Sequence, residues 1–64
     1  MTEFTLLRVP YRVKWRPRKG PPVKAHVATE RGVQVEFEHA ATARRYVDEH
    51  NAAHPHRCYW IVPP

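Results

Sequence analysis

The sequence predicts a small α+β domain in which one four-stranded, mostly antiparallel sheet carries a single helix packed on one face. Three observations support this fold class. Apolar and polar residues alternate between positions 7 and 16, helical spacing begins after His39, and a short apolar segment follows Pro55. The chain has 64 residues, enough for a single basic domain over residues 1–64. The expected order of elements is β-β-β-α-β.

The first predicted strand covers roughly residues 5–16. Side chains alternate between the two faces of a strand, so one face is expected to be buried and the other exposed to solvent. The buried face would carry Leu7, Val9, Tyr11, Val13 and Trp15, and the exposed face Arg8, Arg12, Lys14 and Arg16. Pro10 has no amide hydrogen to donate, which indicates an edge, a bulge or a break at that position.

A loop rich in Pro and Gly, residues 17–22, leads into a predicted hairpin of strands 23–29 and 33–38. The three-residue loop Glu30–Gly32 is typical of a type I turn followed by a left-handed glycine. This loop would set Val27 opposite Val35 and place both of them inward. The other inward residues would be Val23, Ala25, Val33 and Phe37, and the outward pairs would be His26 with Glu36 and Lys24 with Glu38.

Helical spacing begins after His39, with Ala40, Ala43, Tyr46, Val47 and His50 on one face. Pro55 disfavours helical geometry at His54, so the helix should end near residues 51–53. The last strand, residues 57–62, is apolar on both faces, which predicts a position inside the sheet. We place it beside the first strand, which gives the strand order 3-2-1-4.

Positive charge is concentrated in the first third of the chain. The net charge is +5, but residues 8–24 hold seven Lys and Arg residues and no acid. This asymmetry indicates a polyanionic partner. If Trp15 lies opposite Val23, then Lys14 faces Lys24 and Arg12 faces His26, an unfavourable arrangement that an anionic ligand would relieve. The residues expected to contact phosphates are Arg12, Lys14, Arg16, Arg18, Lys19 and Lys24.

Other chemistry has less support in the sequence. His50 and His54 have the spacing of metal ligands on a helix, with His56 and Cys58 nearby, but Pro55 takes His54 off the helix. A single thiol in an apolar segment is typical of a packed residue. We therefore expect no metal, no cofactor, no catalytic residues and no enzymatic activity.

The lone cysteine suits a reducing compartment, and no apolar run approaches the length of a membrane span. We expect a cytoplasmic protein with no membrane partner. Tyr59 and Trp60 lie on opposite faces of the last strand, so one of them can be exposed beside the basic strand. Such an aromatic could stack on a base or anchor a protein contact.

Tyr11, Val13 and Trp15 on one strand, a Gly-containing turn, a strand that includes Phe37 and an Ala-rich helix resemble sheet-plus-helix DNA readers. The arm-binding domains of phage integrases are of this kind, and the resemblance covers roughly residues 11–47. The fourth strand and the acids Glu36 and Glu38 depart from the pattern.

We expect a small nucleic-acid-binding module of phage or prophage origin, in which the basic strand and loop contact the phosphate backbone. The alternative is a protein-interaction module, such as a host-modulating or inhibitory small protein. Its partner would be an acidic protein surface or a second copy in a homodimer.

Overall fold

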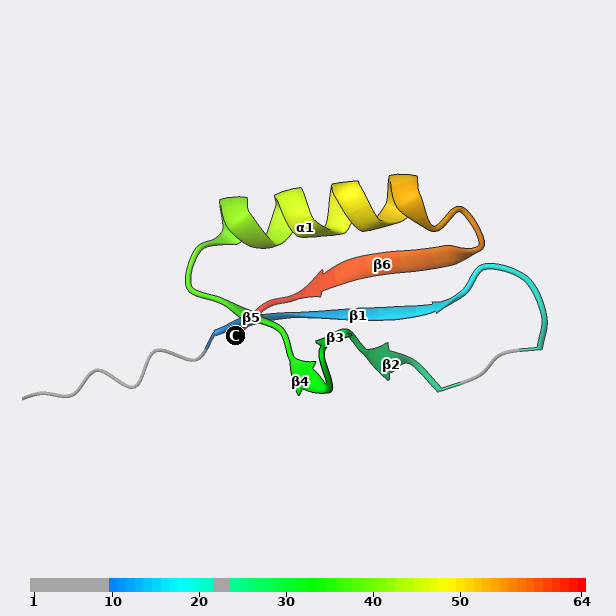
Figure 1. The fold of residues 1–64 in the computed structure, drawn as a ribbon, viewed down its shortest axis with the longest axis horizontal. Coiled ribbons are helices and arrows are strands. Elements are labelled where there is room, and N and C mark those ends of the chain that lie inside the picture. Colours follow the sequence, from blue (N-terminus) through cyan, green and yellow to red (C-terminus); the bar gives the residue numbers. More distant parts are fainter. Residues whose placement is uncertain (1–9, 22–23) are drawn as a thin grey trace, which may run out of the picture.

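A computed structural model describes residues 10–21 and 24–64, and it confirms the predicted α+β class. Figure 1 shows α1 lying alongside β6 and β1. The helix α1 spans Ala40–Ala53, and the strands are β1 Tyr11–Pro17, β2 His26–Val27, β3 Thr29–Glu30, β4 Val33–Gln34, β5 Glu36–Phe37 and β6 Arg57–Val62. The main sheet has four strands, and β3 and β4 form a separate two-stranded sheet.

The central strand of the main sheet is β1. On one side it pairs antiparallel with β6, from Arg12↔Val62 to Pro17↔Arg57. On the other side β2 and β5 lie end to end along it, β2 against Lys14 and Trp15 and β5 against Tyr11 and Arg12. The last strand therefore lies beside the first, as predicted. The predicted order 3-2-1-4 is wrong, because β5 pairs with β1 rather than with β2.

The hairpin between β2 and β5 differs from the prediction. Its pairs are Thr29↔Gln34 and Glu30↔Val33, which leaves the two-residue loop Arg31-Gly32. Both loop residues have positive φ, 52° at Arg31 and 78° at Gly32. These values are typical of a type I′ turn, whose twist matches that of the flanking strands. The amide of Ala28 donates to the carbonyl of Val13 (2.9 Å), and the amide of Val35 donates to the carbonyl of Ala28 (3.1 Å). The chain therefore leaves the main sheet at Ala28 and rejoins it at Val35.

This change of register reverses the faces of β2. His26 lies opposite Trp15 and Val27 opposite Lys14, so Val27 is on the side of the cations and 39% exposed. The predicted inward position of Val27 and the predicted pairs His26–Glu36 and Lys24–Glu38 are therefore wrong. A one-residue slip moves every side chain of a strand to the other face. Val33, also predicted to be inward, is 68% exposed.

The core lies between the sheet and α1. Its buried residues are Val13, Ala28, Val47 and Tyr59, and the side chains packed against them are Trp15, Val35, Phe37, Tyr46 and Ile61. Val13 and Trp15 thus occupy the inward positions predicted for the first strand, and Tyr11 is half-buried. The predicted inward residues Leu7, Val9 and Val23 lie outside the described part of the chain.

The helix ends where the sequence predicts, at Ala53, and His54 has the extended φ of −126° expected before a proline. No helix in the described residues is long and apolar enough to span a membrane.

The last strand has the predicted bounds but lies at an edge of the sheet, not inside it, because β1 is its only partner strand among the described residues. Asn51 of α1 covers part of this edge. Its Oδ1 accepts from the amide of Tyr59 (2.8 Å), and its Nδ2 donates to the carbonyl of Tyr59 (3.2 Å). The side-chain amide thus satisfies backbone groups that a neighbouring strand would otherwise pair with.

The type I′ turn gives a test of the observed register. A left-handed conformation costs a residue with a Cβ atom about 1–2 kcal/mol, and asparagine pays less of this cost than arginine. We expect Arg31→Asn to raise the free energy of unfolding by about 0.5–1 kcal/mol in a urea titration. Arg31→Lys, which keeps both the charge and the strain, is the matched control and should leave it unchanged. An Arg31→Asn protein no more stable than the wild type would contradict the type I′ turn.

Candidate functional site

The two faces of the sheet have different surroundings. Val13, Trp15 and Tyr59 point towards α1, and Glu30 at the end of β3 bonds to Tyr46 of the same helix, so the hairpin approaches this face too. The alternating side chains Arg12, Lys14 and Arg16 point the other way; we call them the basic row. We call their side of the sheet the open face, because no element within residues 10–21 and 24–64 covers it.

Apolar residues flank the basic row on both neighbouring strands. Lys14 lies between Val27 of β2 and Trp60 of β6, and Arg16 lies opposite Cys58. Trp60 is half-buried, and the guanidinium carbon of Arg16 is 6.0 Å from its ring centroid, at the outer limit of a cation–π contact. Lys14 is also half-buried. A lysine among apolar neighbours typically buries its aliphatic stem and keeps its amine in water.

Among the residues that the structure describes, one acidic residue opposes the basic row. Arg12 Nη2 is 4.0 Å from Glu36 Oε1, and the two side chains are 48% and 50% exposed. An ion pair this long and this exposed contributes little stability. Lys14 and Arg16 take part in no ion pair with any described residue. The predicted oppositions Lys14–Lys24 and Arg12–His26 are wrong, because the register sets Val27 and Glu36 at those positions.

Two more of the predicted cations continue the positive charge beyond the end of β1. Arg18 and Lys19 line a hollow of about 200 Å³ together with Pro17, Pro55 and His56. The amide of Arg18 donates to the carbonyl of His56 (2.8 Å), which holds the loop against the turn before β6. Lys24 is exposed but precedes β2 and lies outside the strand pairs, so the structure does not bring it into the basic row.

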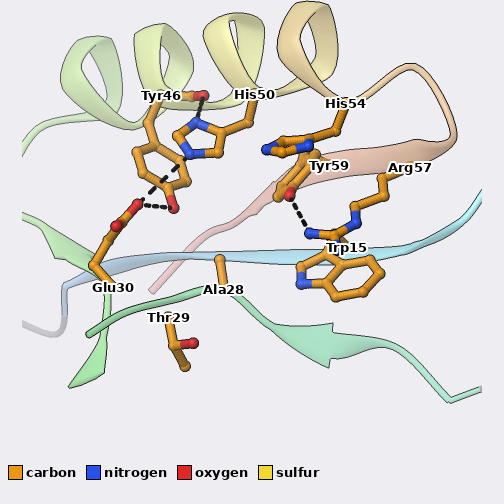
Figure 2. A pocket seen from close by; sticks show the side chains of 9 residues that line it. All are labelled: Trp15, Ala28, Thr29, Glu30, Tyr46, His50, His54, Arg57 and Tyr59. Atoms are coloured by element: carbon orange, nitrogen blue, oxygen red, sulfur yellow. Dashed lines mark hydrogen bonds and ion pairs between the residues drawn. The ribbon is translucent and has the colours of Figure 1, made fainter. Parts of the chain in front are cut away.

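A second hollow, of about 390 Å³, lies on the helix side of the sheet (Figure 2). Figure 2 shows Glu30, Tyr46 and His50 at one end, and Trp15, His54, Arg57 and Tyr59 at the other. The guanidinium of Arg57 lies 4.0 Å from the centroid of the Trp15 ring and donates to Tyr59 Oη (3.1 Å). This contact ties the end of β6 to the centre of β1.

The other end of this hollow is a bonded network. Tyr46 Oη donates to Glu30 Oε1 (3.0 Å), and His50 Nε2 lies 3.6 Å from the same oxygen. The carbonyl of Tyr46 can only accept, so His50 Nδ1, at 2.9 Å, carries its proton and donates. Partial burial, followed by the hydrogen bond to Glu30 and its negative charge, raises the pKa of Tyr46 to about 12. The network joins β3 to α1 at this end of the hollow.

The histidines and the cysteine are not brought together. His50 and His54 face this hollow, with ring centroids 5.9 Å apart, whereas Cys58 lies beside Arg16 on the open face. Over the described ranges, no group of three or more His, Cys, Asp or Glu side chains is arranged to hold a metal ion.

The sequence pattern missed the residues that complete the open face. From the sequence, either Tyr59 or Trp60 could be the aromatic beside the basic strand. In the structure Tyr59 is buried, with 5% of its surface exposed, and Trp60 lies opposite Lys14. The pairing of β1 with β6 decides this, and that pairing has no local signal in the sequence. The contacts of Glu30 and Arg57 likewise depend on long-range pairing.

The chain shows no significant match to any protein-family model, curated protein or solved structure. The resemblance to integrase arm-binding domains therefore remains a prediction from residue pattern.

The Tyr46–Glu30 contact predicts a stability change at high pH. The pKa of Tyr46 in the folded protein lies above its ordinary value of 10.0, so the stability due to this phenol is complete below pH 10 and is lost as the pH approaches 12. Glu30→Gln should lower the pKa of Tyr46 but leave it above 10, because burial, the largest cause, remains. Ultraviolet titration of the phenolate, with Tyr46→Phe to identify the transition, measures this. An unchanged pKa in Glu30→Gln would contradict the contact.

Proposed function

We propose that this protein is a nucleic-acid-binding module, not an enzyme, and that the open face contacts the phosphate backbone. The observation that carries the proposal is the basic row, three cations on alternate positions of β1. Within residues 10–21 and 24–64, Glu36 is its one acidic neighbour, and that ion pair is weak. Alternate residues of a strand are about 6.6 Å apart, so their charges form a regular line along the sheet. Arg18 and Lys19 follow in the loop after β1 and add positive charge near that end of the strand.

A polyanion suits this face better than a second copy of the chain. Two open faces in contact would bring one basic row against another, and like charges opposed across a sheet are destabilising. An acidic protein could also meet the charge. The spacing along one strand, however, favours a ligand whose charges repeat along a line, as the phosphates of a nucleic acid do.

The test compares two double variants that each remove two positive charges. Lys14→Gln/Arg16→Gln changes the open face, and Arg44→Gln/Arg45→Gln changes exposed positions of α1. We expect the first to weaken binding to oligonucleotides and to reduce the slope of log affinity against log salt, by about 0.7 per lost contact for a single strand and 0.9 for a duplex. The helix variant should bind nearly as the wild type does.

Fluorescence anisotropy over a series of salt concentrations measures both quantities. The proposal fails if the wild type has no affinity for DNA or RNA at low salt. It also fails if both double variants lose affinity equally, because a diffuse charge effect would then account for the binding. Retained binding to an acidic protein without nucleic-acid binding would favour the protein-interaction alternative.

A further inference from the structure

We infer that the open face takes single-stranded nucleic acid, and that Trp60 stacks on an unpaired base while the basic row holds the adjoining phosphates. This inference rests on the proposed function and names the class of ligand. The observation behind it is the position of Trp60, which is determined by the pairing of β6 with β1.

Trp60 lies on β6, next to the middle of the basic row. It is directly opposite Lys14, and the pairs on either side, Arg12↔Val62 and Arg16↔Cys58, make both arginines its diagonal neighbours. Diagonal neighbours on adjacent strands are about 7–8 Å apart, within reach of long side chains. A base on the indole would thus have cations around it, positioned for the phosphates on either side.

The environment of Trp60 differs from that of the other tryptophan. Trp15, on the opposite face, packs against the core and lies under the guanidinium of Arg57 at 4.0 Å, with the ring of His26 at 4.6 Å. Arg16 is 6.0 Å from Trp60, too far for the close contact that Arg57 makes with Trp15. The core therefore holds Trp15 on the helix side, whereas Trp60, equally half-buried, lies on the open face beside the cations.

The pairing of an aromatic with cations favours a single strand over a duplex. In a duplex the bases stack on one another and their faces are inaccessible, whereas in a single strand an unpaired base can turn onto an aromatic side chain. Proteins that bind single strands combine a positive surface with such aromatics, and the stacking tolerates every base. The expected ligand is a short single-stranded segment of DNA or RNA with little sequence preference.

The experiment measures the affinity of a short oligothymidylate and of a duplex of the same length, for the wild type, Trp60→Phe and Trp60→Leu. Removing a stacked base contact costs roughly 5- to 150-fold in affinity. We expect Trp60→Leu to lose this much affinity for the single strand and Trp60→Phe to lose less. The affinity of both variants for the duplex should change by less than their affinity for the single strand. Circular dichroism of each variant confirms that the fold is kept.

A second measurement does not depend on a change at Trp60. The chain has two tryptophans, so Trp15→Phe leaves Trp60 as the sole indole fluorophore and keeps an aromatic ring in the core. Oligothymidylate should quench its emission. If the wild type binds no nucleic acid, the proposed function fails. If it binds but neither prefers the single strand nor quenches Trp60, the proposed function stands and this inference is overturned.

Discussion

The structure depends on one constraint: β1 is the centre of the sheet, and its alternate side chains must suit two different environments. One set packs under α1, where Val13 is fully buried. The other set is the basic row, which cannot be packed into the core, because a buried charge without a partner is strongly destabilising. The one helix in the described part of the chain can cover one face, so the distribution of charge along β1 decides which face that is. The open face follows from the same alternation that builds the core.

The hairpin sets the composition of that face. Because the chain leaves the sheet at Ala28 and returns at Val35, β2 and β5 occupy successive parts of the same edge of β1. The small side chain of Ala28 fills the core position, and Val27 is turned towards Lys14. Had the three-residue loop formed, His26 would flank the basic row instead. A two-residue turn thus controls the chemistry of a surface formed by other strands.

Local pattern predicted much of the fold. The alternation in β1, the helix and its end before Pro55, and the bounds of β6 all depend on residues close in sequence. The errors concern pairing: the hairpin register, the strand order and the position of β6 at an edge. Strand β6 is apolar on both sides because Tyr59 lies under α1 and Trp60 contributes to the open face. The prediction had instead explained this apolar character by a position between two other strands. Of the six predicted cations, the structure places Arg12, Lys14 and Arg16 in one row, and Arg18 and Lys19 in the loop after β1, where they line a hollow with Pro55 and His56. It leaves Lys24 apart, because residue 24 lies outside the strand pairs.

The most direct test of the central claim uses the two tryptophans, since they lie on opposite faces of one sheet. Each indole N–H gives its own signal in a ¹⁵N-labelled protein, and a titration with single-stranded oligonucleotide reports on both faces in one experiment. We expect the indole signal of Trp60 to shift together with the amides of β1 and β6, and that of Trp15 to move little. A shift of Trp15 with Trp60 unchanged would place the ligand on the helix side and contradict the account.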